Sequence, residues 1–198
     1  MKKQPKQERS QRIVEAVLEG ATRILSKTPL SQASTNKIAE IAGVGIGSLY
    51  DYFPNKKSIV TLLIDRHMDK ILADFKSLLE AAERQSIDEQ IENFLSFFET
   101  EFFGRKDFLR EIFQLAPETG RMEILFEMRI EAVKLLSAHI LKKLPDLGAE
   151  ASELKAFFLI HGLMGILESY VMQETVGFSA GDLKNELRKT MRFILLES

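Results

Sequence analysis

The sequence of 198 residues contains no cysteine. This absence excludes a disulfide framework, a thiol nucleophile and a thiolate metal site. The three histidines, His67, His139 and His161, are far apart in the chain and lack the spacing of a metal motif. We therefore expect no bound metal ion, and the absence of cysteine fits a cytosolic protein.

Long apolar segments are missing as well. The basic and polar stretch Met1–Ser10 is not followed by the apolar core that a signal peptide requires. The longest apolar run, Phe157–Leu167, contains His161 and is shorter than the about 20 residues that a membrane-spanning helix needs. These absences predict a cytoplasmic protein without a membrane partner.

Catalytic motifs are also lacking. The glycines from Gly43 to Gly47 do not form a dinucleotide-binding loop, because Ser48 replaces the third glycine and no hydrophobic strand precedes them. A Gly-x-Ser-x-Gly elbow is missing too, since Tyr50 stands where the second glycine should be. The sequence predicts neither an enzyme nor a cofactor.

Charge is unevenly distributed along the chain. The formal net charge is −2, but the stretch up to Lys57 has ten basic and five acidic residues and carries +5, which leaves −7 for the remainder. This asymmetry suggests that only the N-terminal part meets a polyanion, although without a motif it could equally be chance. The basic leader Lys2, Lys3, Lys6 and Arg9 is either an arm that touches DNA or a solvated tail.

Apolar residues recur at helical spacing almost everywhere, and the strict alternation of strands is missing. The pattern predicts an all-α fold of about nine helices, with Pro54 as the seam between a head, residues 1–54, and a body, residues 55–198. The expected helices cover roughly residues 13–25, 34–42, 44–53, 55–79, 87–102, 106–115, 121–144, 152–173 and 179–196, and the one at 106–115 is expected to end before Pro117.

The most informative stretch, residues 34–56, reads as two short helices around a turn at Gly43. Ser34 or Thr35 could cap the first helix. The small side chains of Ala39 and Ala42 permit the two helices to cross closely. Such a pair, crossing at a steep angle, presents the open face of its second helix to the major groove of DNA.

Three runs in this stretch have the spacing found in the DNA-binding heads of TetR-family repressors. They are Ile38-Ala39-x-x-Ala42-Gly43-Val44, Gly47-x-Leu49-Tyr50-x-Tyr52-Phe53 and the following Lys56. The chain from Arg9 to Ile71 therefore resembles the TetR family, whereas only length and helix pattern support the likeness beyond. The resemblance implies a helix-turn-helix DNA-binding domain over residues 1–54 and an effector-binding and dimerisation domain over residues 55–198.

The resemblance also implies which residues contact DNA. The start of the first motif helix would hold a phosphate, and the start of the second would face the bases. The tyrosine hydroxyls and Lys56 would reach further phosphates, although the tyrosine rings could instead pack the head. The implied DNA-binding residues are Thr35, Asn36, Lys37, Gly45, Ile46, Gly47, Ser48, Tyr50, Tyr52 and Lys56.

Gly45 departs from the family pattern, in which this position is commonly a serine that caps the helix. A glycine cap costs roughly a few tenths of a kcal/mol, so the helix should still form. The run Ile46-Gly47-Ser48 lacks the Arg, Asn and Gln side chains that make bidentate base contacts. We hypothesise that Ile46 contacts thymine methyl groups, that Ser48 and Lys37 add hydrogen bonds, and that DNA shape supplies the remaining specificity.

TetR-like bodies are usually homodimers, and the last two predicted helices are apolar on more than one face. They could form a four-helix interface between two subunits, or they could cover the core of their own subunit. The residues expected at the interface are Leu159, Leu163, Ile166, Tyr170, Leu187, Met191, Ile194 and Leu195.

TetR-like bodies also bind small molecules among their middle helices, which are rich in phenylalanine here. Most of these rings are expected in the core, but a pocket among them would favour a hydrophobic or aromatic effector. His161 could orient that ligand or be an ordinary core histidine. The expected ligand-binding residues are Phe98, Phe102, Phe113, Phe126, Phe157, His161 and Met164.

The sequence thus predicts a repressor that binds a palindromic DNA operator as a homodimer and is released by a small apolar effector. An activator, or a regulator without a ligand, is an alternative within DNA binding. A helical adaptor protein whose head no longer binds DNA is an alternative from another class. A helical enzyme is disfavoured because the catalytic motifs are absent.

Overall fold

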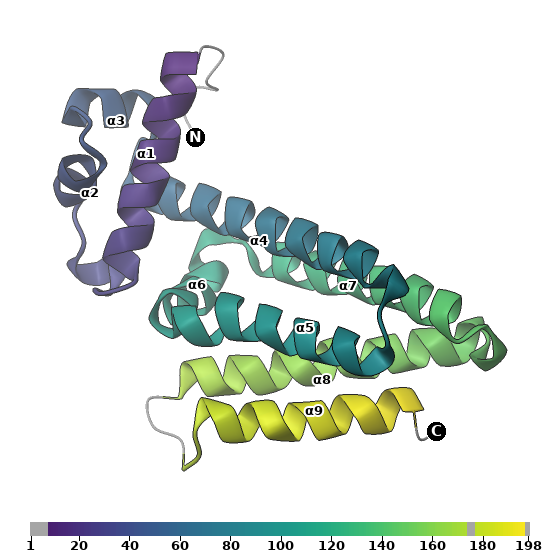
Figure 1. Ribbon diagram of the computed structural model, residues 1–198. Helices are drawn as coiled ribbons and strands as arrows, with labels where there is room; N and C mark the ends of the chain where they lie inside the picture. Colours follow the sequence, from purple (N-terminus) through teal and green to yellow (C-terminus); the bar gives the residue numbers. More distant parts are fainter. Residues whose placement is uncertain (1–7, 174–176, 197–198) are drawn as a thin grey trace. The chain divides into compact units, whose positions relative to one another are not determined.

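The computed structural model describes residues 8–173 and 177–196, so the leader residues Lys2, Lys3 and Lys6 lie outside the described part. Over these residues the fold is all-helical, as predicted, and short 3-10 turns join several of the nine α-helices (Figure 1). The helices are α1 Glu8–Leu25, α2 Thr35–Ala42, α3 Ile46–Tyr52, α4 Lys56–Ala81, α5 Ile87–Glu101, α6 Lys106–Thr119, α7 Met122–Lys143, α8 Ala149–Met172 and α9 Ala180–Leu196.

The chain forms two compact units. Unit 1 contains the described residues up to 67 together with 107–122, and unit 2 contains 68–106 together with the described residues from 123 onward. Helix α4 is continuous through residue 67, so its first part belongs to unit 1 and its last part to unit 2. The predicted functional division after residue 54 stays a prediction, because compactness does not test where DNA or a ligand binds.

Side chains cap the helices where the sequence offers them. Of the two candidates for α2, Ser34 is the cap, and its hydroxyl accepts a hydrogen bond from the Lys37 N–H. A capping box is present at the start of α5, where Ser86 and Glu89 are bonded reciprocally. These caps satisfy N–H groups that have no partner within the helix, which fixes where each helix begins.

The predicted end of α6 was wrong. The helix continues through Pro117 to Thr119 instead of ending before the proline. A proline removes one backbone N–H donor, but in the last turn of a helix few backbone hydrogen bonds depend on it. The helix ends instead at Gly120, which adopts the left-handed conformation with φ of 71°, and the Arg121 N–H then donates back to the Ala116 carbonyl at 2.8 Å.

Helices α1 and α2 pack closely in unit 1 because Gly20 has no side chain. A Cβ atom at Gly20 would lie 3.1 Å from the Ala42 nitrogen and 3.1 Å from the Ile38 carbonyl oxygen. Beside this contact, Leu49 and Phe53 are fully buried. The core of unit 1 therefore holds the helix-turn-helix segment against α1.

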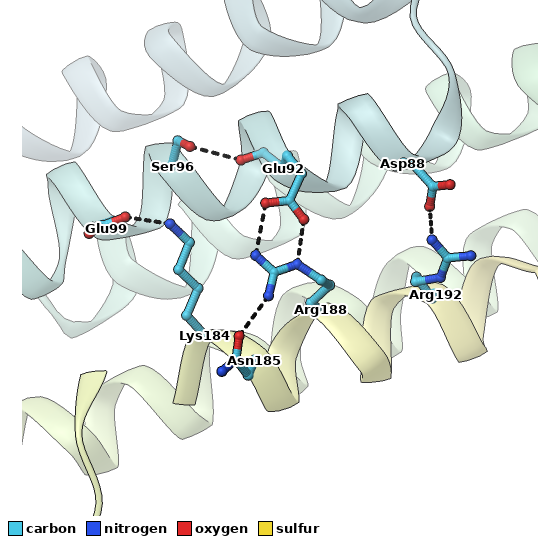
Figure 2. A network of polar contacts seen from close by, with 8 residues as sticks. All are labelled: Asp88, Glu92, Ser96, Glu99, Lys184, Asn185, Arg188 and Arg192. Atoms are coloured by element: carbon cyan, nitrogen blue, oxygen red, sulfur yellow. Dashed lines mark hydrogen bonds and ion pairs between the residues drawn. The ribbon is translucent and has the colours of Figure 1, made fainter. Parts of the chain in front are cut away.

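An ion-pair ladder joins α5 and α9 on the surface of unit 2 (Figure 2). Glu92 of α5 binds the Arg188 guanidinium with both carboxylate oxygens, one of them at 2.8 Å from Nη2. The other two pairs are Asp88 with Arg192 and Glu99 with Lys184. The acidic side of α5 thus faces the basic side of α9, so the ladder helps to hold the C-terminal helix on unit 2.

Among the described helices, α8 alone is long and apolar enough to cross a membrane by length and composition. Its inner face is buried in unit 2, including Leu159, Leu163 and Leu167. A helix that packs into a protein core passes the same test, so the length and composition of α8 do not indicate a membrane protein.

Candidate nucleic-acid interface and internal cavities

Helices α2 and α3 meet at a tight turn that requires glycine. Gly43 has φ of 66°, a left-handed conformation that glycine adopts without strain. Its N–H and that of Val44 donate to the last carbonyls of α2, which ends the helix there. Gly45 then occupies the cap position of α3 and supplies no side-chain hydrogen bond, as predicted from its lack of a hydroxyl.

The two faces of α3 differ sharply in exposure. Leu49 and Tyr52 point into unit 1, whereas Ile46 and Tyr50 are 40% and 43% exposed. Gly47 is exposed as well, and Ser48 is half-buried. Ile46, Gly47 and Tyr50 lie at positions i, i+1 and i+4, so they share one side of the helix and form a small open surface.

The two tyrosines of α3 have different environments. The Tyr50 hydroxyl lies 2.8 Å from the Thr35 hydroxyl, which links the exposed face of α3 to the first turn of α2. The Tyr52 ring is buried, and its hydroxyl donates to Ser10 of α1 at 2.8 Å. Tyr50 therefore presents its hydroxyl at the surface. Tyr52 instead packs the head, as the sequence had left open for both tyrosine rings.

The predicted basic contacts also differ. Lys37 is exposed, like its neighbour Asn36, and its ammonium group pairs with Glu40 at 2.9 Å. The Lys56 ammonium donates to the Ala33 carbonyl at 2.7 Å and also to the Leu30 carbonyl. Lys56 thus donates hydrogen bonds to two carbonyls of the segment between α1 and α2. This structural role could not be predicted from the spacing of residues in the sequence. Its phosphate contact stays a prediction.

This geometry is that of a helix-turn-helix, and residues 17–62 match the family model described as bacterial regulatory proteins, tetR family. This segment of the chain, which contains α2 and α3, is therefore similar to the DNA-binding head of the TetR family. The match and the helix-turn-helix together support a DNA-binding transcriptional regulator. No curated protein matches the chain in sequence.

Solved structures share the TetR-family fold at low sequence identity. A protein from Mesorhizobium loti MAFF303099 assigned to this family is 16% identical, with 96% of this chain and 98% of that chain covered and a TM-score of 0.76. A transcriptional regulator from Cytophaga hutchinsonii is 17% identical, with coverage of 93% and 97% and a TM-score of 0.74. FadR from Bacillus subtilis, solved in complex with stearoyl-CoA, is 18% identical, with coverage of 93% and 98% and a TM-score of 0.61.

Unit 2 contains two small cavities, each partly open to the surface. The first, which we call the phenylalanine cavity, has a volume of about 30 Å³ and is lined by Phe75, Phe94, Phe98, Phe102, Arg129 and Met164, among others. The second, which we call the amide cavity, has a volume of about 60 Å³ and is lined by Gln90, Phe94, His139, Lys143 and Met191, among others. Phe94 is common to both walls.

Hydrogen bonds fix the polar side of the amide cavity. The Gln90 amide nitrogen donates to the carbonyls of Ala82 and Gln85, at 3.1 and 3.0 Å. Its oxygen therefore faces His139 Nε2 at 2.9 Å, which requires that this nitrogen carry a hydrogen. Burial, then the charges of Lys143 and Lys142, lower the pKa of His139, so the ring is neutral near neutral pH.

The structure brings together three of the seven expected ligand-binding residues, Phe98, Phe102 and Met164, in the phenylalanine cavity. Phe113 belongs to unit 1, and Phe126 and Phe157 are about half exposed. The His161 ring lies 4.3 Å from that of Phe157 and lines a surface groove. The helical spacing of phenylalanines does not determine which rings face inward. The expected ligand-binding residues are therefore only partly those that line the phenylalanine cavity.

The expected interface residues divide in the same way. Four of them, Leu159, Leu163, Leu187 and Met191, are buried in the core of their own subunit. Ile166 is exposed, whereas Tyr170, Ile194 and Leu195 are half-buried. The sequence left open whether these residues form the interface or cover the core of their own subunit. The first four residues belong to the core. The exposed apolar face instead consists of Leu154, Phe157, Phe158, Ile166, Met172, Phe193 and Leu196.

Proposed function

We propose that this TetR-family regulator is a cytoplasmic repressor that binds a palindromic operator as a homodimer and releases it when an apolar effector binds. In this proposal the DNA-binding function lies in residues 1–54, and effector binding and dimerisation lie in residues 55–198. The observation that carries it is the combination of the exposed face of α3 with internal apolar cavities in unit 2.

The exposed apolar face of α8 and α9 supports the homodimer. Phe158 and Phe193 are 60% and 61% exposed, although large apolar side chains usually avoid water. Ala151, Leu154, Phe158 and Phe193 border one surface groove of about 370 Å³. A second copy of the chain would cover this face by two-fold symmetry and would place two α3 helices on one operator.

The cavities and the fold neighbours support an apolar effector. The phenylalanine cavity is lined by hydrophobic side chains apart from Arg129. FadR from Bacillus subtilis, which shares the fold, was solved with stearoyl-CoA, and AlkX from a Dietzia strain is implicated in the biodegradation of n-alkanes. A molecule with a hydrocarbon chain is therefore the class of effector that we propose.

Helix α4 offers a route by which the effector could act on DNA binding. Its residues Ile71, Leu72 and Phe75 line the phenylalanine cavity, and the same helix begins at Lys56, directly after the helix-turn-helix. A ligand that prefers one position of α4 shifts the population toward that position. Release follows if the preferred position separates the two α3 helices from the spacing of the operator.

Selection from a random duplex library tests the DNA-binding proposal. We expect the wild type to enrich an inverted repeat and the Lys37→Ala/Tyr50→Ala protein to lose that enrichment. Lys56 is left intact because its removal would take away a hydrogen-bond donor from the Leu30 and Ala33 carbonyls. Arg84→Ala, an exposed change in unit 2, is the control and should enrich the same repeat.

Three other outcomes would contradict parts of the proposal. If nothing enriches even at low salt, where phosphate contacts are strongest, the adaptor alternative replaces the regulator. If a single half-site enriches and the protein is monomeric in solution, the homodimer is wrong. If the operator is bound but no alkyl compound releases it, the protein is a regulator without this class of effector.

A further inference from the structure

Arg129 is an unusual residue in the wall of the phenylalanine cavity. It is the one charged residue among the described residues that line this cavity. Its side chain is 14% exposed, and its Nε atom is buried without a hydrogen-bond partner in the described part of the chain. A buried donor without an acceptor is destabilising, so its presence calls for a physical reason.

The surroundings of Arg129 leave room for one further acceptor. One terminal nitrogen, Nη2, binds the Glu168 carboxylate of α8, and the guanidinium carbon lies 5.8 Å from the ring of Phe126. Glu168 thus holds the guanidinium from one side without reaching Nε. Burial lowers the pKa of Arg129, yet an arginine keeps its charge in proteins and remains able to bind a second anion.

We infer that the cavity binds an alkyl carboxylate, with its carboxylate on Arg129 and its hydrocarbon chain among the phenylalanines. This inference rests on the proposed function only for the regulatory role of the ligand. Arginine is the side chain best suited to a carboxylate, because its N–H groups form a planar fork that matches the two oxygens. The ring cluster of Phe75, Phe94, Phe98 and Phe102 supplies the apolar surroundings for the chain.

Room for the chain requires that side chains move. The phenylalanine cavity of about 30 Å³ and the amide cavity of about 60 Å³ share Phe94 as a wall. A rotation of the Phe94 side chain would join the two spaces into one longer apolar path. The ligand chain would then run from Arg129 past Phe94 toward Leu159 and Met191, which line the amide cavity.

Calorimetric titration of the full-length protein with decanoate, decan-1-ol and decylamine separates the head group from the chain. We expect decanoate to bind the wild type at least about tenfold more tightly than the alcohol. One charge-assisted hydrogen bond is sufficient for a difference in affinity of this size. Arg129→Met should remove this preference, because decanoate binding weakens more than binding of the alcohol. Glu168→Gln should tighten decanoate binding, because a competing carboxylate is removed from the guanidinium.

Two further variants keep the test informative. Arg129→Lys retains the charge but lacks the Nε donor, so it should lose most of the preference even if Arg129→Met fails to fold. Arg192→Met removes an arginine that is also paired with a carboxylate, Asp88, but lies outside both cavities, and it should behave as the wild type.

The inference is overturned if Arg129→Lys keeps the full preference for decanoate, or if decylamine binds as tightly as decanoate. It is also overturned if no decyl compound binds a protein that still selects an operator, and the regulator proposal then stands. If decanoate binds through Arg129 but leaves operator affinity unchanged, the site is correct and the effector role proposed above is wrong.

Discussion

Replacing Gly20 by valine tests whether the close packing of α1 on α2 supports the DNA-binding surface. Even a single methyl group would lie 3.1 Å from two backbone atoms of α2, and valine adds two more carbons. Backbone cannot rotate away as a side chain can, so the helices must separate. Overpacking of this kind costs about 1–3 kcal/mol, and replacing a helical glycine by valine returns only about half a kcal/mol. We expect a net loss of about 1.5 kcal/mol.

Hydrogen exchange measured by mass spectrometry reports this loss locally. A loss of about 1.5 kcal/mol makes amide exchange in α1–α3 about twelvefold faster where exchange follows the opening equilibrium. Gly181→Ala in α9 is the control, because its added methyl group meets the Ser179 oxygen at an ordinary 3.5 Å. Exchange in α1–α3 that stays within twofold of the wild type for Gly20→Val would refute the reasoning, since the helices could then separate without cost.

Three more predictions concern individual side chains. Tyr50→Phe should lower operator affinity about tenfold, measured by DNA titration, without changing stability. Tyr52→Phe should lower the unfolding free energy by about 1 kcal/mol, measured by urea unfolding, and leave operator affinity unchanged. The reverse pattern would contradict the roles assigned to the two tyrosines. Lys37→Ala should reduce the slope of log affinity against log salt by about 1, and an unchanged slope would mean that Lys37 touches no phosphate. The pKa of His139 is lowered in the folded protein, so the unfolded chain takes up the proton first as the pH falls through 6.5. Urea midpoints should therefore decrease as the pH falls below about 6.5 in the wild type and decrease less in His139→Gln. Equal decreases in the two proteins would show that His139 is not responsible.

The helix-turn-helix could be predicted from the sequence because its determinants are local. The left-handed turn needs Gly43, the cap needs a residue such as Ser34, and the buried residues Leu49, Tyr52 and Phe53 recur at helical spacing. Each of these requirements involves residues within a few positions of one another. The order of the helices in the described residues was therefore predictable, whereas the sequence left open whether the ring of Tyr50 lies at the surface.

The buried and exposed faces of the helices in unit 2 could not be predicted as well, because α8 is apolar around most of its circumference. Leu159 and Phe158 are adjacent and equally hydrophobic, yet the first is 2% exposed and the second 60%. Periodicity cannot distinguish an inner from an outer face when both are apolar. The expected interface and ligand residues were consequently divided between core, surface and cavity.

The sequence by itself determined the helices, their caps and the glycine turn, since these depend on neighbours in the chain. Tertiary structure alone decided that Lys56 binds the Leu30 and Ala33 carbonyls and that Arg129 lines a phenylalanine cavity. Such contacts join residues far apart in the sequence, and no local pattern specifies which of many polar side chains will meet. They become defined only when the packed core has fixed the face that each helix turns inward.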